Sequence, residues 1–168
     1  MRAYEIFRRL SNDELDAVVL AACEDEEIPD KIAGGVLTFQ KIPLTRFAKL
    51  GEETRKAYVR RTLRDRQSAD LSLFVVSAAL LQGKAEMIAA FLESLGVPHD
   101  GPHVSVEGEI PEPEPEKLDA AIEALFAAYP ARDVAIYLHA FASQPDVRWK
   151  TLDARLLSEP RLSLGEPE

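Results

Sequence analysis

The 168-residue sequence has little cysteine and no long apolar run. Its one cysteine, Cys23, cannot form a disulfide within the chain, so nothing indicates an oxidising compartment. The N-terminal residues lack the apolar stretch of a signal peptide. The longest nearly uncharged apolar run, 71–81, has 11 residues, whereas a membrane-spanning helix needs about 20. We therefore expect a cytoplasmic protein that has no membrane partner.

Signatures of catalysis are also absent. The sequence contains no Walker loop, no GxGxxG, HExxH or GxSxG motif, and no cysteine pair that could bind zinc. Cys23 lies at the edge of an apolar stripe and beside the acidic run 24–27, whose charge disfavours a reactive thiolate. We therefore expect a structural cysteine. These absences favour a non-catalytic protein and indicate no cofactor.

What the sequence does contain is apolar residues at helical spacing. Ser11 and Glu14 form a capping box, which predicts that a helix begins there and continues to about residue 24. Residues 71–82 have almost no polar face, which predicts a central helix surrounded by others. Gly96, followed by an apolar residue and Pro98, predicts that the preceding helix ends at or near Leu95. The sequence thus predicts an all-α fold.

The segments 71–95 and 118–141 both have the pattern of a helical hairpin, and we expect these antiparallel hairpins to pack around the central helix. They recur at an offset of about 47 residues, which is similar to the spacing of some helical repeats. Between them, 96–116 forms a long irregular connection rich in proline and glutamate. These features predict one domain of seven to nine helices over 1–158 and a frayed tail at 159–168.

Positive charge is concentrated in the segment 41–66. This segment carries nine lysines and arginines against three acids, a net charge of +6, whereas the rest of the chain carries −15. Lys56, Arg60 and Arg64 fall on one helical face, and Arg61 lies near them. Guanidinium groups bind carboxylates and phosphates through forked hydrogen bonds, so we expect these four side chains to bind a partner. A competing interpretation is that they pair with the protein's own acidic helices.

The leading hypothesis for function is a non-catalytic helical module that binds another protein in the cytosol through the basic segment or the irregular connection. An acidic protein is favoured over nucleic acid, because a surrounding charge of −15 repels an extended polyanion. One alternative is binding of phosphate or nucleic acid through 41–66. Another is a small helical enzyme or metal-binding protein that uses His99, Asp100 and His103, since imidazole and carboxylate groups are metal ligands.

Overall fold

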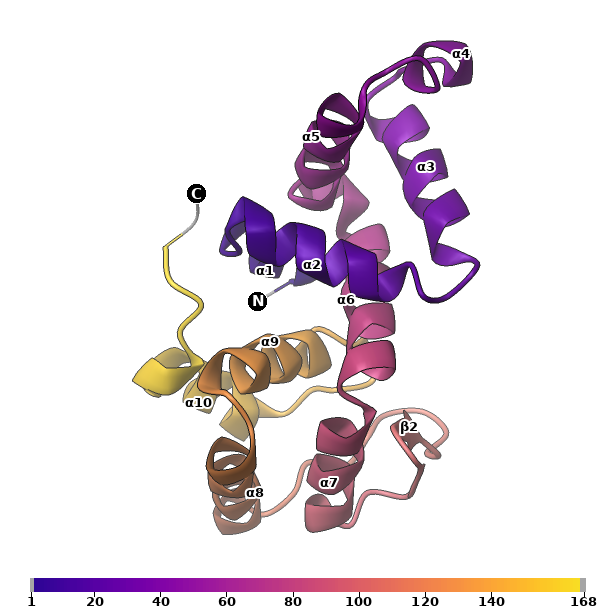
Figure 1. Ribbon diagram of the computed structural model, residues 1–168. Helices are drawn as coiled ribbons and strands as arrows, with labels where there is room; N and C mark the ends of the chain where they lie inside the picture. Colours follow the sequence, from indigo (N-terminus) through magenta and orange to yellow (C-terminus); the bar gives the residue numbers. More distant parts are fainter. Residues whose placement is uncertain (1, 167–168) are drawn as a thin grey trace. The chain divides into compact units, whose positions relative to one another are not determined.

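The computed structural model describes residues 2–166, and the prediction of an all-α fold is confirmed (Figure 1). Helices make up 68% of the chain. The described residues contain ten α-helices, two short 3-10 helices and one two-stranded sheet, which is slightly more than the seven to nine helices predicted. The chain divides into two compact units, Arg2–Gln82 and Gly83–Gly165. The prediction of a single folding domain over 1–158 stays a prediction.

In the first unit, the predicted capping box lies at the start of α2 (Asn12–Ala22). The Ser11 amide donates to the Glu14 carboxylate at 2.8 Å, and the Glu14 amide donates back to the Ser11 hydroxyl at 3.3 Å. Two backbone donors at the start of the helix are satisfied in this way. The elements of this unit are α1 (Ala3–Arg8), α2 (Asn12–Ala22), α3 (Ile28–Phe39), α4 (Leu44–Phe47), α5 (Glu52–Leu63), the 3-10 helix η1 (Arg66–Ser68) and α6 (Ala69–Gly83).

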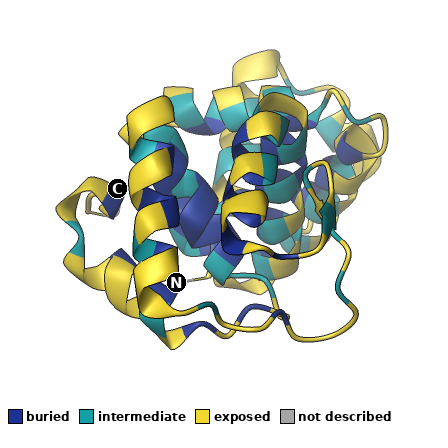
Figure 2. Cartoon of the chain, turned by 90° about the horizontal axis from the view of Figure 1, so that it is seen from below, coloured by how far each residue is buried: buried dark blue, intermediate teal, exposed yellow. Residues whose placement is uncertain are grey.

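Helix α3 forms although it contains two adjacent glycines. Its residues Ile28, Ile32 and Val36 recur at four-residue spacing and are all buried, so one apolar stripe stabilises the helix against α5. Burial of this stripe outweighs the cost of about 1 kcal/mol per glycine in a helix. Figure 2 shows the same pattern in other helices, with buried residues on inner faces and exposed residues outside.

Buried hydroxyl groups hold the end of α5 against α6. The hydroxyl of Ser72, which is fully buried, donates to the carbonyl of Leu63 at 2.8 Å. The hydroxyl of Ser68, which is also buried, donates to the carbonyl of Thr62 in the last turn of α5. Carbonyls at a helix C-terminus have no partner within the helix, so these side chains supply one. These internal hydrogen bonds therefore fix the position of the C-terminal end of the basic helix α5.

Helix α6 corresponds to the predicted central helix, but it is not buried on every side. Val75, Val76 and Ala79 are buried, whereas the side chain of Phe74 is 39% exposed. The ammonium of Lys31 lies 4.0 Å from the centroid of the Phe74 ring, which gives this exposed ring a cation–π contact. The expectation that other helices surround this helix therefore does not hold at Phe74.

In the second unit, α7 (Ala85–Leu95) ends where the sequence predicts. Gly96 has φ of 69°, a left-handed conformation that favours glycine, and α7 ends at Leu95 as expected. Helix α7 packs against α8, and α8 contacts α9. The elements of this unit are α7 (Ala85–Leu95), β1 (His99–Asp100), β2 (His103–Val104), α8 (Pro115–Ala128), α9 (Ala131–Ala142), α10 (Lys150–Ser158) and the 3-10 helix η2 (Pro160–Leu162).

An aromatic cluster forms much of the core of the second unit. The ring of Phe91 meets those of Tyr137 and Phe141 edge to face, and Phe141 contacts the buried Trp149. Burial raises the pKa of the Tyr137 hydroxyl far above its usual range. The Trp149 indole donates to the carbonyl of Ile110 at 2.8 Å. This bond fixes the irregular connection to the core near its C-terminal end.

The described part of the tail differs from the fraying expected for 159–168. Leu162 and Leu164 are buried, and Nε2 of His139 lies 3.0 Å from the Leu162 carbonyl oxygen. Arg132 donates to the carbonyl of Leu164 at 3.0 Å. The two leucines supply the apolar area that holds this segment, although it contains two prolines and a glycine. Residues 167–168 lie outside the described part.

None of the described helices is by itself long and apolar enough to span a membrane.

Candidate functional site

Helix α5 carries much of the predicted basic segment and lines two surface grooves. The first, which we call the apolar groove, encloses about 360 Å³. The second, which we call the arginine groove, encloses about 620 Å³. The structure therefore separates the four predicted partner-binding residues: Lys56 borders the apolar groove, whereas Arg60, Arg61 and Arg64 line the arginine groove.

The apolar groove is formed by side chains from α2, the start of α3, α4 and α5. Leu20 of α2 is 74% exposed, whereas Ile32 of α3 is buried beneath the groove. A single exposed leucine is common, but a hollow lined by several neighbouring apolar side chains is an apolar patch, and exposed patches of this kind mark interaction sites. The apolar lining consists of Val19, Leu20, Cys23, Pro29, Ile32, Ala33, Phe47 and Val59.

Four charged residues border the apolar groove, and both acids among them have a basic partner. Lys56 contacts Glu52 at 2.8 Å, and the hydrogen bond between them lowers the pKa of Glu52. Asp16 accepts a hydrogen bond from Nε of Arg60 at 2.8 Å. Arg55 is exposed, and no salt bridge engages it in the part of the chain that the structure describes. The border thus presents one basic group that is available to an incoming acid.

Cys23 lines the apolar groove and is partly exposed. Burial raises the pKa of its thiol, so the thiolate is disfavoured at neutral pH. This direction agrees with the expectation that the cysteine is unreactive, although its side chain is only partly buried. Because it is the only cysteine of the chain, a thiol reagent reports on this groove alone.

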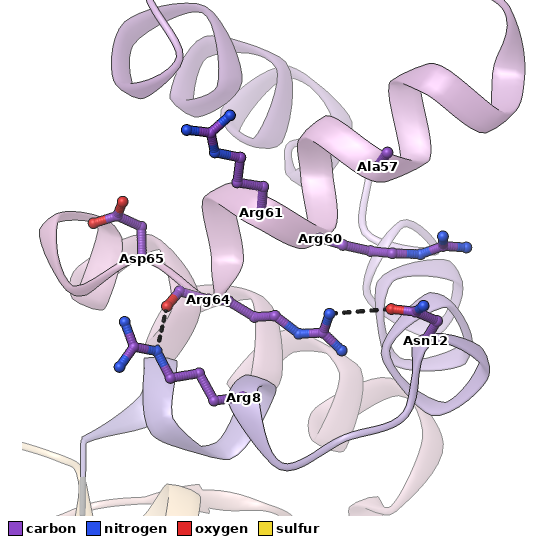
Figure 3. Close-up of a pocket in the computed structure, with 7 residues that line it drawn as sticks. All are labelled: Arg8, Asn12, Ala57, Arg60, Arg61, Arg64 and Asp65. Carbon is purple, nitrogen blue, oxygen red and sulfur yellow. Dashed lines mark hydrogen bonds between the residues drawn. The ribbon is translucent and has the colours of Figure 1, made fainter. Parts of the chain in front are cut away.

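The arginine groove lies between α5 and the end of α1 (Figure 3). Ala57 of α5 lines the groove, and because its side chain is a single methyl group it leaves space between the longer side chains around it. Asn12, at the start of α2, lies at one end of the groove in this view and Asp65 at the other. Four arginines complete the lining: Arg8, Arg60, Arg61 and Arg64.

Arg64 anchors the end of α1. Its Nε donates to the Phe7 carbonyl at 3.0 Å, one Nη to the Leu10 carbonyl at 2.8 Å, and the other Nη to the Asn12 side chain at 3.1 Å. The carbonyl of Arg64 in turn accepts a hydrogen bond from Nε of Arg8 at 2.8 Å. A positive group that binds carbonyls at a helix C-terminus is stabilising there, so Arg64 has a structural role within the groove.

The internal-pairing interpretation is correct for part of the basic segment. Arg60 forms a two-pronged ion pair with Asp16 of α2, and its side chain is only 18% exposed. Lys56 pairs with Glu52 and Glu53 of its own helix. Arg61 is the exposed member of the predicted set, and no hydrogen bond engages it in the described residues. Sequence spacing placed these residues on one helix but could not show which of them have internal partners.

Two residues of these grooves, Arg8 and Leu20, were not predicted from the sequence. Arg8 lines the arginine groove but belongs to α1, which α2, α3 and α4 separate from α5 in the sequence, and no periodicity links the two segments. Leu20 had a signal, because it falls outside the stripe that contains Leu15 and Ala22. An apolar side chain away from the buried stripe of an amphipathic helix indicates a second apolar contact.

The structure does not bring His99, Asp100 and His103 together as metal ligands. They lie on a small antiparallel hairpin in which Asp100 pairs with His103, whereas His99 pairs with Val104. Successive strand residues point to opposite faces, so His99 is on the other side from the Asp100–His103 pair. Nδ1 of His99 is hydrogen-bonded to the Gly101 carbonyl at 2.8 Å. Within residues 2–166, no group of three or more His, Cys, Asp or Glu side chains is placed so that it could hold a metal ion.

No protein-family model, no curated protein and no solved structure matches this chain.

Proposed function

We propose that the unit Arg2–Gln82 is a non-catalytic protein-interaction module that holds an amphipathic helix of an acidic partner protein in the apolar groove. The observation that carries the proposal is the groove itself, an exposed apolar hollow bordered by charged side chains. Helices bind in grooves of this kind by burying residues spaced three or four apart. The predicted cytosolic location is part of the same proposal.

The exposed leucines support a protein ligand. Leu20 is 74% exposed and lines the groove, and Leu44, at the start of the adjacent helix α4, is 63% exposed. Covering a leucine side chain that is exposed in the free protein contributes about 1.5–3 kcal/mol to binding. Anchors of this size, surrounded by polar groups that exclude water, are typical of the centre of a protein interface.

The charges around the groove support an acidic partner. Asp16 and Glu52 are already paired with Arg60 and Lys56, so they repel an incoming carboxylate less than free acids would. Arg55 is exposed at the border. The segment 41–66, which contributes α4 and α5, has a net charge of +6. A partner helix with apolar residues on one face and acids beside them complements both properties.

The test uses a display library of random helical peptides, from which those that bind the protein are selected. The affinity of each selected peptide is then measured by fluorescence anisotropy. We expect selected peptides to carry apolar residues at three- and four-residue spacing and a net negative charge. Leu20→Glu should weaken their binding by about tenfold or more, because it places a charge in the apolar lining. Bound peptide should also slow alkylation of Cys23 by iodoacetamide.

The matched control is Leu157→Glu, which changes a leucine of α10 that is 90% exposed and lies outside the groove. This variant should bind the peptides as the unaltered protein does. Both variants should retain the helical circular dichroism spectrum. Selection of peptides with no shared apolar pattern, or equal binding by the Leu20 variant, would reject the apolar groove as the partner site.

A further inference from the structure

We propose that Arg55 determines which partner helices the apolar groove accepts, by binding one carboxylate beside the apolar residues of the bound helix. This role rests on the proposed function and adds the position that the partner's acid must occupy. Arg55 belongs to α5, lines the groove and is exposed. No hydrogen bond or salt bridge engages its guanidinium in the described residues. Its donors are therefore available to a ligand.

The other charged residues at the border of the groove are already paired. Asp16 forms a two-pronged ion pair with Arg60. Lys56 contacts Glu52 at 2.8 Å. Each pair carries one positive and one negative charge, so the two pairs together add no net charge to the border. Arg55 is thus the charge that decides which sign the border attracts.

Lys56 is less available than Arg55 to an incoming acid. Its ammonium lies 2.8 Å from Glu52 and 3.3 Å from Glu53, and hydrogen bonds to these two carboxylates raise the pKa of Lys56. A partner's carboxylate at Lys56 would have to approach two like charges of α5. Without Arg55, this end of α5 would present two acids and one base to the partner.

The surroundings of Arg55 favour a strong ion pair. Its guanidinium has a planar fork of donors that binds both oxygens of a carboxylate. Val59, one turn after Arg55 on α5, also lines the groove, so the pair forms beside an apolar surface. A bound helix covers that surface and excludes water from it. The pair is then screened less than one on an open surface.

Arg55 and Leu20 lie on different walls of the groove, and this fixes the side of the partner helix that carries the acid. Leu20 lies on α2 and Arg55 on α5. The hollow of about 360 Å³ is near the lower end of the range for small-molecule pockets, so a helix that fills it meets both walls. The partner's carboxylate must then lie on the flank that faces α5, whereas the residues that cover Leu20 are apolar.

A charge at this position supplies discrimination that the apolar lining lacks. An apolar surface accepts many amphipathic helices, and specificity between them often depends on a repulsive contact with the wrong partner. A helix with lysine or arginine on the flank that faces α5 would meet Arg55 as a like charge, which disfavours binding. Charges elsewhere on the partner are more distant and are screened by salt. Arg55 therefore selects by the position of one acid.

The experiment selects the library of random helical peptides in parallel against the unaltered protein and against Arg55→Glu. We expect the same apolar spacing from both selections, since the apolar lining is unchanged. One position beside the apolar residues should be Asp or Glu in the first selection and Lys or Arg in the second. Because Arg55 is exposed, the variant should retain the helical circular dichroism spectrum.

The matched control is Arg61→Glu, which makes the same change of charge at the other exposed arginine of α5. Arg61 lines the arginine groove and does not line the apolar groove. Selection against this variant should again give an acid at the flanking position.

Fluorescence anisotropy then compares one selected peptide with a copy in which the flanking acid is replaced by lysine. Arg55→Glu should weaken binding of the acidic peptide by about tenfold, and it should bind the lysine peptide more tightly than the unaltered protein does. Arg61→Glu should change either affinity by less than about twofold. The preference for the acidic peptide should weaken as salt is added.

Three results would overturn the role of Arg55. Equal losses with Arg55→Glu and Arg61→Glu would show a general field of α5 instead of a specific contact. An unchanged acid preference with Arg55→Glu would place the acid at another residue, while the shared apolar pattern would keep the groove as the partner site. Peptides with no shared apolar pattern would reject the groove and Arg55 together. Failure of Arg55 and failure of the groove are therefore separate outcomes.

Discussion

The guanidinium of Arg60 binds the carboxylate of Asp16 through two hydrogen bonds, across 44 residues of sequence. This pair connects α5 to α2 and lies between the apolar groove, which Asp16 borders, and the arginine groove, which Arg60 lines. Its side chains are 18% and 27% exposed. Because water screens such a pair less than a fully exposed one, this ion pair stabilises the packing of α5 against α2 between the two grooves.

We predict that Asp16→Asn lowers the melting temperature at pH 7 and that this difference shrinks in acid. The hydrogen bond from Arg60 lowers the pKa of Asp16. A carboxyl whose folded pKa is lowered stabilises the fold above its unfolded pKa, about 3.9, and loses that contribution as pH falls through the folded pKa. Thermal melts from pH 7 to pH 2.5 would show the two curves converging below about pH 4.

The control for this prediction is Glu24→Gln, which removes an exposed acid that makes no recorded contact in the described residues. Its melting temperature should stay close to that of the unaltered protein throughout the pH range. A constant deficit for Asp16→Asn at all pH values would show that the side chain acts through packing, with no contribution from its charge.

The tail should contribute to stability through Leu162. Replacing this fully buried side chain by alanine should lower the free energy of unfolding by about 3 kcal/mol. Leu157→Ala, five residues earlier, should change it by less than about 0.5 kcal/mol because Leu157 is 90% exposed. Urea unfolding followed by the fluorescence of Trp149, the only tryptophan, measures both variants. Similar values for the two would show that the tail is not held by burial.

Glu112 should stabilise α10 from outside the helix. Its carboxylate accepts the backbone amide of Thr151 at 2.7 Å, and this hydrogen bond lowers the pKa of Glu112. Trp149, at the N-cap position of α10, offers no side-chain cap of its own. Glu112→Ala should therefore cost about 0.5–1 kcal/mol at pH 7, and this cost should fall as the pH drops below about 4.3.

Glu107→Ala is the matched control, because Glu107 lies in the same connection, is exposed and makes no recorded contact in the described part of the chain. Urea unfolding should show little change for this variant at any pH. A cost for Glu107→Ala equal to that for Glu112→Ala would attribute the effect to net charge and would contradict the capping role.

Features encoded within a few residues could be predicted from the sequence. The Ser11–Glu14 capping box and the left-handed stop at Gly96 were both placed correctly, because each depends on backbone groups three to five residues apart. The all-α fold follows from the repetition of such local signals.

Features that depend on the meeting of distant segments could not be predicted. The pairing of Arg60 with Asp16 depends on the packing of α5 against α2, and no property of either segment specifies the other. The burial of Leu162 required a surface on α9 that the sequence did not place. Both grooves arise in the same way, so the sequence indicated the basic residues that α5 contributes but neither Arg8 nor the shape of the grooves.

The adjacent glycines of α3 offer a last prediction, which tests how closely α3 meets α6. Gly34 is exposed, and a Cβ there would meet no atom within 4 Å. Gly34→Ala should therefore stabilise the protein by about 1 kcal/mol, through helix propensity and a less flexible unfolded chain. A Cβ on Gly35 would overlap Cδ2 of Leu71, so that side chain must move.

Gly35→Ala gains the same propensity but must displace Leu71, which is partly buried on α6. Forcing a side chain away from its preferred rotamer costs about 0.5–1.5 kcal/mol, and a tight contact adds to that cost. We expect Gly35→Ala to be at least about 1 kcal/mol less stable than Gly34→Ala in urea unfolding. Equal stabilisation by the two substitutions would mean that Leu71 yields without cost and that α3 and α6 pack more loosely than the structure shows.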